Sequence, residues 1–180
     1  SRFFMKGTSA MPAALDAAEL RRLDRDHCWH PLFQHSQLDG ATELTVFDRG
    51  AGSTLYDSDG KAYLDAGGGL WNVNVGYGRD EICRAAFAQM QRLPYYPHSQ
   101  INEPATRLAA RLAELLPGDE VHGNLNRVFF SNSGSEANES AFKIARQCQR
   151  QRHPGQNRYK IIARYQGYHG FTMGALSATG

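Results

Sequence analysis

Two short polar loops carry the residue types that could bind a phosphorylated aromatic ligand. The first loop, SNSGSE at residues 131–136, lies between an apolar run and a helical pattern. Backbone N–H groups at a helix N-terminus attract phosphate, Gly134 permits close approach, and Ser133 and Ser135 add hydroxyl donors. The same spacing, Ser133-x-x-Glu136, also fits a capping box that satisfies the helix amides without a ligand. Spacing alone leaves both interpretations open and favours the cap.

The second loop, QGYHG at residues 166–170, follows the next β-type run. The face of Tyr168 could stack on a planar heterocycle whose phosphate is held in the first loop. The alternative is that Tyr168 and His169 are simply packed and hydrogen-bonded. Taken together, the two loops predict a site for a phosphorylated aromatic cofactor.

The elements around these loops explain why they should meet. Residues 127–130 and 159–164 have β-type composition, and an amphipathic helical pattern lies between them. This order predicts one βαβ unit with parallel strands and a right-handed crossover. Because the carboxyl ends of parallel strands share one edge of a sheet, both loops are expected at that edge.

Periodicity predicts further elements upstream of this unit: an amphipathic helix over 12–29, an antiparallel meander over 44–47, 54–56 and 62–64, and helices over 81–93 and 104–116. Asp80 is placed to cap the helix over 81–93, whose apolar face is expected to be core. A chain of 180 residues is long enough for one sizeable core.

Composition excludes several classes of protein. The chain is 41% hydrophobic and 21% charged, which is typical of a folded globular chain. The net charge of +2, with both signs interspersed, gives no reason to expect nucleic acid. No apolar run approaches the roughly 18 residues of a membrane span, and the start does not resemble a secretory signal. Three cysteines without a C-x-x-C pattern favour reduced thiols and a cytoplasmic location.

Two groups of residues could be mistaken for metal sites. His27, Cys28, His30 and His35 are close in sequence, but no second ligand pair accompanies them, so ordinary packing is favoured and no metal is expected. The DSDG run at 57–60 lacks the remaining acidic positions of a calcium loop. It is therefore interpreted as a hairpin turn.

Several motifs resemble one enzyme family. Residues 131–139 (SNSGSEANE), 168–170 (YHG) and 55–65 look like class III, pyridoxal-phosphate-dependent aminotransferases of fold type I. Residues 71–78 (WNVNVGYG) and 93–96 (LPYY) further resemble the branch that uses ω-amino acids, amines or taurine as donors and pyruvate as the usual acceptor.

The resemblance runs from about residue 28 to the end and implies an α/β fold. A helix and a small β-meander segment would occupy residues 1–80, and residues 81–180 would form the first part of the cofactor-binding large domain, with its mainly parallel sheet. The resemblance also implies a homodimer. It implies the following site residues: Ser133, Gly134 and Ser135 on the cofactor phosphate, Tyr168 stacked on the pyridine ring with His169 beside it, and Trp71 and Tyr96 in the substrate pocket.

The chain departs from the family in its lysines. In the family, the Schiff-base lysine comes well after the Tyr-His-Gly loop, and no lysine of this chain fits that position: Lys6, Lys61, Lys143 and Lys160 all precede the loop. We therefore expect the chain to be the N-terminal part of a longer enzyme and to be inactive alone. The alternatives are a non-catalytic fragment that binds pyridoxal phosphate or phosphate, and an aminomutase of the same family.

Overall fold

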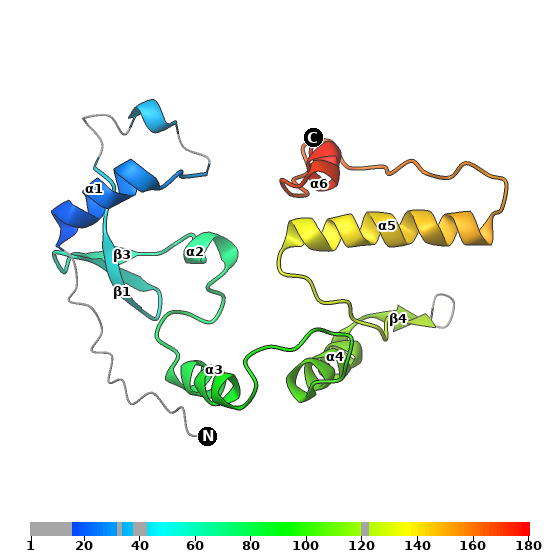
Figure 1. Ribbon diagram of the computed structural model, residues 1–180, viewed down its shortest axis with the longest axis horizontal. Coiled ribbons are helices and arrows are strands. Elements are labelled where there is room, and N and C mark those ends of the chain that lie inside the picture. Colours follow the sequence, from blue (N-terminus) through cyan, green and yellow to red (C-terminus); the bar gives the residue numbers. More distant parts are fainter. Residues whose placement is uncertain (1–15, 32–33, 38–42, 120–122) are drawn as a thin grey trace, which may run out of the picture. The chain divides into compact units, whose positions relative to one another are not determined.

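The computed structural model describes residues 16–31, 34–37, 43–119 and 123–180. The chain divides into two compact units, a first unit over residues 1–95 and a second unit over residues 96–180. The division into domains after residue 80 stays a prediction. The elements, shown in Figure 1, are α1 (Ala17–His27), η1 (His35–Gln37), β1 (Phe47–Ala51), β2 (Thr54–Asp57), β3 (Ala62–Leu64), α2 (Gly68–Trp71), α3 (Asp80–Arg92), α4 (Glu103–Leu115), β4 (Gly118–Asp119), β5 (Gly123–Asn124), α5 (Gly134–Arg152) and α6 (Met173–Ala178).

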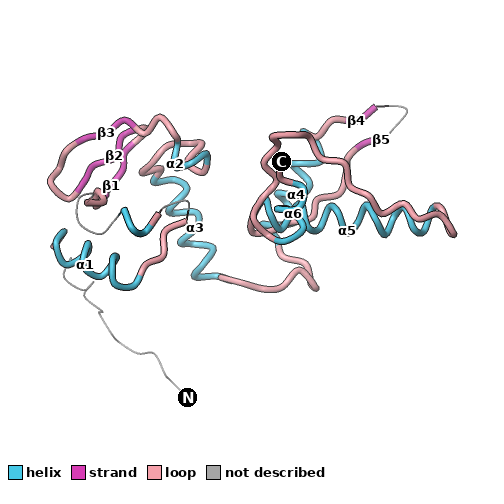
Figure 2. The backbone as a smooth tube through the Cα atoms, turned by 90° about the horizontal axis from the view of Figure 1, so that it is seen from above, coloured by secondary structure: helices cyan, strands magenta, loops and turns pink. Residues whose placement is uncertain are grey.

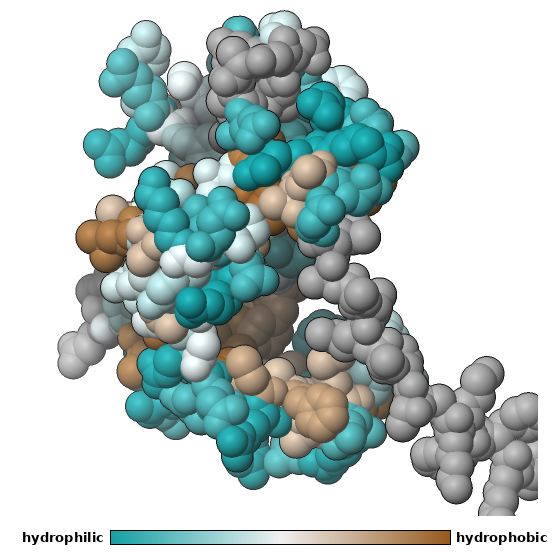
Figure 3. Space-filling view, turned by 90° about the vertical axis from the view of Figure 1, so that its left-hand side faces the viewer, coloured by the Kyte–Doolittle hydropathy of each residue, from teal (hydrophilic) through white to brown (hydrophobic). Residues whose placement is uncertain are grey.

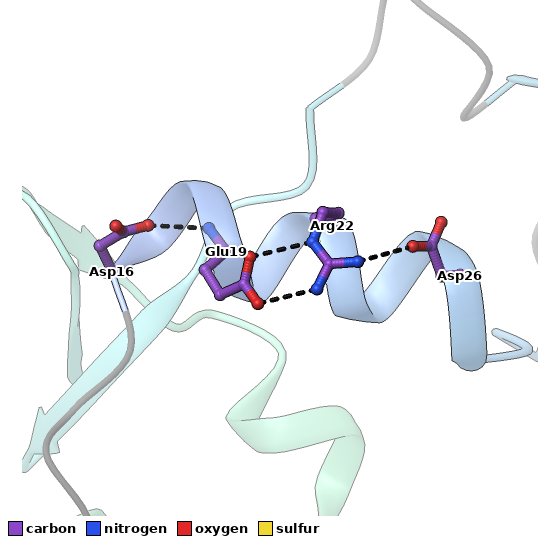
Figure 4. A network of polar contacts seen from close by, with 4 residues as sticks. All are labelled: Asp16, Glu19, Arg22 and Asp26. Carbon is purple, nitrogen blue, oxygen red and sulfur yellow. Dashed lines mark hydrogen bonds and ion pairs between the residues drawn. The ribbon is translucent and has the colours of Figure 1, made fainter.

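Helix α1 confirms the predicted amphipathic helix over residues 17–27, whereas residues 12–15 lie outside the described residues. Its N-cap, Asp16, accepts a hydrogen bond from the N–H of Glu19 at 2.8 Å. Figure 4 shows how Arg22 then bridges Glu19, one turn earlier, and Asp26, one turn later. Such i,i+3 and i,i+4 ion pairs on an exposed face each stabilise a helix slightly.

The predicted meander is an antiparallel sheet of order β1-β2-β3, visible as three adjacent strands in Figure 2. Its first strand is Phe47–Ala51, so the prediction of residues 44–47 was wrong in position. The register explains the difference: the β1-β2 ladder begins at the pair Phe47 and Asp57, and before it one backbone hydrogen bond, from the N–H of Ser58 to the carbonyl of Val46 at 2.8 Å, continues the contact.

The DSDG run is the predicted hairpin turn between β2 and β3. The Asp57 carboxylate accepts hydrogen bonds from the N–H groups of Asp59 (3.0 Å) and Lys61 (2.8 Å). It also accepts a hydrogen bond from the Tyr63 hydroxyl at 2.9 Å. Asp57 is thus occupied in closing the turn.

Helices α3 and α4 confirm the two predicted helices to within one residue at each end. The cap of α3 was predicted wrongly. Arg79 is the N-cap and makes no capping hydrogen bond, while Asp80 is the first helical residue and pairs with Arg84 at 2.7 Å. Helix α4 is capped by Asn102, whose side chain accepts from the N–H of Ala105 at 3.0 Å.

The predicted βαβ unit is only partly formed. Helix α5 lies where it was expected, but residues 127–130 and 159–164 on either side of it form no β-ladder. The prediction of two parallel strands was therefore wrong for this chain, because a strand needs neighbours to receive its hydrogen bonds and these two segments do not pair. The second unit's described ladder is the short pair β4-β5.

Among the described residues, very little apolar surface is buried. Ala175 is the one buried hydrophobic residue among those that the structure describes. The apolar face predicted to be core on α3 is exposed, with Phe87 and Met90 each 63% accessible, because nothing in the described part of the first unit covers it. Figure 3 shows such hydrophobic residues, in brown, at the surface among hydrophilic ones. The expected sizeable core is therefore absent from the described residues, and none of their helices is long and apolar enough to span a bilayer.

Candidate functional site

The N-terminus of α5 carries the first predicted loop, and the predicted capping box is formed in a variant in which Glu136 bonds one residue before the N-cap. The Ser133 hydroxyl accepts a hydrogen bond from the N–H of Glu136 at 3.2 Å. The Glu136 carboxylate turns back and accepts from the N–H of Asn132 at 2.8 Å. Ser133 and Glu136 therefore fix the entry of the chain into the helix.

The cap leaves part of the helix end available. The backbone N–H groups of Gly134 and Ser135 have no hydrogen-bond partner among the described residues. A Cβ atom placed on Gly134 would meet no other atom within 4 Å, so the space beside these amides is open. Two free amides at the positive end of a 19-residue helix form a place for an anion such as phosphate. The cap at Ser133 therefore leaves these two amides accessible.

Side chains on the first turns of α5 hold the second predicted loop. The Ser135 hydroxyl accepts a hydrogen bond from the N–H of Phe171 at 3.1 Å. The Asn138 side-chain amide donates to the carbonyl of His169 at 2.6 Å. Ser135 and Asn138 are three residues apart and so lie on one face of the helix. The Tyr168-His169 loop is thereby fixed beside the N-terminus of α5.

Glu139 lies on the same face of α5 and binds the N-terminus of α6. Its carboxylate accepts hydrogen bonds from the N–H groups of Gly174 (2.7 Å) and Ala175 (3.2 Å), which belong to the first turn of α6. The Thr172 hydroxyl, followed by these two amides, lowers the pKa of Glu139. Figure 1 shows α6 beside the N-terminal end of α5 accordingly.

Gly170 and Thr179 close the loop from its other side. Gly170 is buried with φ at +128°, and a Cβ there would lie 2.9 Å from the Cα of Ser135. Only glycine fits both conditions. The Thr179 hydroxyl accepts from the N–H of His169 at 3.0 Å.

The two predicted ring residues differ in their exposure. Tyr168 is 65% accessible and touches Phe171 edge-on, with ring centroids 5.4 Å apart. Its ring is therefore available to a planar ligand. The Nε2 atom of His169 is buried and has no hydrogen-bond partner among the described residues.

The segment around Tyr96 lies in the second unit, next to the first loop. The His98 ring stacks on Phe130, with centroids 5.6 Å apart and planes 19° apart. Phe130 directly precedes the loop at residues 131–136. Tyr96 itself is half exposed, at 49%.

Trp71 belongs to the first unit and ends the turn α2. It is 80% exposed and has a left-handed backbone, with φ at +66°. A left-handed conformation costs an L-residue about 1–2 kcal/mol, so this turn is held under strain. The role of Trp71 in a substrate pocket stays a prediction.

Two of the histidines singled out as a possible metal site, His30 and His35, have protein partners. His30 Nε2 lies 2.8 Å from an Asp24 carboxylate oxygen, and the N–H of His30 donates to His35 Nε2 at 3.0 Å. The hydrogen bond with His30 lowers the pKa of Asp24. No group of three or more potential ligands is assembled in the described ranges.

Sequence reasoning missed three residues that build the site. Asn138 and Glu139 lie in the motif at 131–139, and their spacing of three and four from Ser135 was the available signal. Thr179 carried no local signal, because it acts on a residue ten positions away.

Known proteins resemble this chain over most of its length. Residues 37–180 match the family model Aminotransferase class-III. The chain is 49% identical over 161 residues to the uncharacterized aminotransferase YhxA of Bacillus subtilis, covering 89% of this chain and 33% of that protein. It is 42% identical to a taurine–pyruvate aminotransferase of Rhodobacter capsulatus, covering 95% and 36%. The chain thus spans about a third of the length of these relatives.

A solved structure shows the same fold. The (S)-enantioselective omega-transaminase of Thermomicrobium roseum superposes with a TM-score of 0.85 at 45% identity, covering 93% of this chain and 36% of that one. The fold is therefore that of the N-terminal part of a fold type I transaminase. Class-III aminotransferases depend on pyridoxal phosphate, which is a phosphorylated aromatic cofactor of the kind that the two loops suit. With the family model matched from residue 37 onward, the chain belongs to the class-III aminotransferases.

Proposed function

We propose that the protein carrying this chain transfers an amino group from an ω-amino acid, an amine or a taurine-like donor to pyruvate or another keto acid. The observation that carries the proposal is the junction at the N-terminus of α5, where free amides and the Tyr168-His169 loop are held together by Ser135 and Asn138. Relatives named as taurine–pyruvate and putrescine–pyruvate aminotransferases support the donor class. The family is typically dimeric, so we propose a homodimer.

The residues present suit the cofactor. The Gly134 and Ser135 amides, with the neighbouring Ser133 hydroxyl, would hold the phosphate, and the open space beside Gly134 leaves room for it. Tyr168 would stack on the pyridine ring. The next residue, His169, has a buried Nε2 atom without a hydrogen-bond partner among the described residues, and this atom is available to a polar group of the cofactor. Bound there, pyridoxal phosphate supplies the electron sink for amino-group chemistry. The chain's own residues bind and orient it.

The lysine required for turnover is proposed to lie outside these 180 residues. Of the described lysines, Lys61 lies over the Tyr63 ring at 5.0 Å, and Lys143 lies along α5, whose N-terminus holds the proposed phosphate site. Lys160 belongs to the exposed segment before the second loop. We therefore expect the isolated chain not to turn over.

A substitution at Gly134 tests the proposal in the full-length protein. Gly134→Val fills the space that the phosphate would occupy, and its Cβ would meet no atom of the described residues within 4 Å. We expect pyridoxal phosphate to bind at least tenfold more weakly while the thermal midpoint of the apo protein stays unchanged. Turnover is measured as the alanine that forms when pyruvate is the acceptor and taurine, putrescine or an ω-amino acid is the amino donor.

Three results would contradict the proposal. Full cofactor occupancy in Gly134→Val would show that the loop at residues 131–136 caps α5 and does not bind the cofactor phosphate. Failure of every donor to aminate pyruvate in the wild-type holoenzyme would remove the transaminase assignment. Conversion of an amino acid into its isomer without any keto acid would indicate an aminomutase instead.

A further inference from the structure

The second unit contains a cavity between α5, α6 and the segment that returns from the end of α5. Lys143 and Arg146 line it from α5, Ile161 and Ala163 from the returning segment, and Ala178 from α6. Figure 1 shows the returning segment, in orange, running back along α5 toward α6. The cavity has a volume of about 800 Å³, which is within the range of small-molecule sites.

Two side-chain contacts fix the returning segment against α5. The Arg146 guanidinium lies 5.8 Å from the centroid of the Tyr159 ring, within the range of a cation–π interaction. The Arg158 guanidinium donates a hydrogen bond to the side-chain oxygen of Gln149 at 3.3 Å. The helix and the segment that line the cavity are therefore connected by their own side chains.

The two cations of the cavity have no carboxylate partner. Neither Lys143 nor Arg146 makes an ion pair among the described residues. Arginines earlier in the chain do make such pairs, namely Arg21, Arg22, Arg79, Arg84, Arg107 and Arg111. The sequence explains the difference, because residues 140–180 contain two lysines and five arginines but no aspartate or glutamate. The positive charge at the cavity is therefore not neutralised by its neighbours in the sequence.

Glu139 is the one acidic residue that lines the cavity from the described part of the chain. Its carboxylate is already bound to the N–H groups of Gly174 and Ala175, at 2.7 and 3.2 Å. Two cations and one carboxylate leave the lining with a net charge of +1. An oxyanion would form charge-assisted hydrogen bonds with the two cations.

Hydroxyl and apolar groups complete the lining. The Ser177 hydroxyl donates to the carbonyl of Met173 at 2.7 Å, so its hydrogen is already used. The Ser140 hydroxyl has no hydrogen-bond partner among the described residues and is available to a ligand. Phe142, Ile161 and other apolar residues form much of the remaining surface. A ligand with a carbon skeleton would remove this apolar surface from water, whereas an inorganic ion would not.

We propose that this cavity binds the oxyanion of a small organic acid, a carboxylate or a phosphate ester. Lys143 and Arg146 are the charged contacts, and Ser140 donates its hydroxyl. The proposal does not depend on the proposed transaminase function, because it uses no residue of the cofactor site.

The experiment titrates the full-length protein with succinate, glycerol 3-phosphate and inorganic phosphate by calorimetry. Saturating pyridoxal phosphate is present throughout, so that the N-terminus of α5 is not offered to the probes. Lys143→Gln and Arg146→Gln each remove one cation of the cavity. The matched control is Arg150→Gln, because Arg150 lies on the same face of α5, one turn beyond Arg146, and does not line the cavity.

A second measurement locates the bound probe. Trace acetylation followed by mass spectrometry gives the reactivity of Lys143, with Lys61 of the first unit as the internal reference. It requires no variant, so it decides the proposal even if Arg146→Gln folds poorly through loss of the Tyr159 contact.

We expect one organic probe to bind the wild-type protein about tenfold more tightly than inorganic phosphate does, and which one it is distinguishes a carboxylate from a phosphate ester. Lys143→Gln and Arg146→Gln should each weaken that binding about tenfold, and Arg150→Gln should leave it unchanged. The bound probe should slow acetylation of Lys143 and not of Lys61.

Four results would overturn the proposal. The first is a wild-type protein that binds neither organic probe. The second is unchanged affinity in Lys143→Gln, or no protection of Lys143. The third is an equal loss of affinity in Arg150→Gln, which would indicate attraction by the overall positive charge. The fourth is equally tight binding of inorganic phosphate, which would remove the role of the apolar lining.

Discussion

The side-chain amide of Asn138 donates to the carbonyl of His169 at 2.6 Å, across 31 positions of sequence. One helix end therefore supplies free amides for an anion and also holds the loop that carries an exposed tyrosine ring. Because this hydrogen bond joins the two halves of the proposed cofactor site, binding would not have to order one half against the other.

Removal of this hydrogen bond should weaken the proposed cofactor site. In Asn138→Ala the His169 carbonyl loses its donor, and the loop keeps only its bond to Ser135 on this face of α5, so the Tyr168 ring is held less firmly. We expect pyridoxal phosphate to dissociate about tenfold more readily, as measured by absorbance titration of the full-length apo protein. Asn157→Ala, at an exposed asparagine after α5, is the matched control and should leave the affinity unchanged. Equal affinity in all three proteins would disprove the role of Asn138.

Gly170 should tolerate no side chain. Gly170→Ala suffers both a positive φ and a clash with Ser135, whereas the control Gly155→Ala has φ at +81° and open space. Positive φ alone costs about 1–3 kcal/mol, so both variants should be less stable, and Gly170→Ala the more so. Only Gly170→Ala should also lose cofactor affinity. Denaturant unfolding and absorbance titration check both expectations; a Gly155→Ala protein equally defective in binding would show that strain, not the contact with Ser135, is responsible.

Local patterns predicted those parts of the fold that depend on neighbours in sequence. Ser133 and Glu136 form the box that their spacing indicates, and Asp57 closes the turn that its motif indicates. Residues 127–130 and 159–164 were misjudged, because a β-strand exists only when another segment accepts its hydrogen bonds. The residue types of a segment indicate its tendency to adopt an extended conformation, but they do not show whether a neighbouring strand is present to pair with it.

The structural features that no local sequence pattern predicts depend on hydrogen-bond partners that are distant in the sequence. Helix α6 is short, and its N-cap residue makes no side-chain capping hydrogen bond. Instead, the Glu139 carboxylate accepts a hydrogen bond from the N–H of Gly174, 35 positions later in the sequence. The left-handed conformation of Leu70 and Trp71 contradicts their intrinsic preference. The turn is anchored from outside by Asp65, whose carboxylate accepts hydrogen bonds from the N–H of Gly69 and the hydroxyl of Tyr77. Such tertiary overrides of local preference are expected where a site is built.

The contribution of Glu139 should depend on pH. Its pKa in the folded chain is lowered, first by the Thr172 hydroxyl, below the ordinary value of about 4.3. The ionised carboxylate therefore stabilises the fold above that pH, and this stability is lost as the pH falls through the folded pKa. We expect Glu139→Gln to lower the urea midpoint at pH 7, with the difference from wild type shrinking below about pH 4. Glu114→Gln, which loses an exposed ion pair with Arg111, is the control and should show a much smaller change. A pH-independent difference for Glu139→Gln would contradict an ionic role.

Ser133 allows the two interpretations of the first loop to be separated. Ser133→Ala removes the oxygen that caps α5 and should cost about 1 kcal/mol of stability. Ser133→Asp restores a capping oxygen and places a negative charge at the helix N-terminus, so stability should return to the wild-type level. The same charge would repel a phosphate dianion bound at the Gly134 and Ser135 amides. We therefore expect Ser133→Asp to unfold like wild type yet bind pyridoxal phosphate at least tenfold more weakly, with the gap narrowing as salt screens the repulsion. If Ser133→Asp bound the cofactor as tightly as wild type, the amides beside it would not be the phosphate site, and Ser133 would serve α5 as a cap alone.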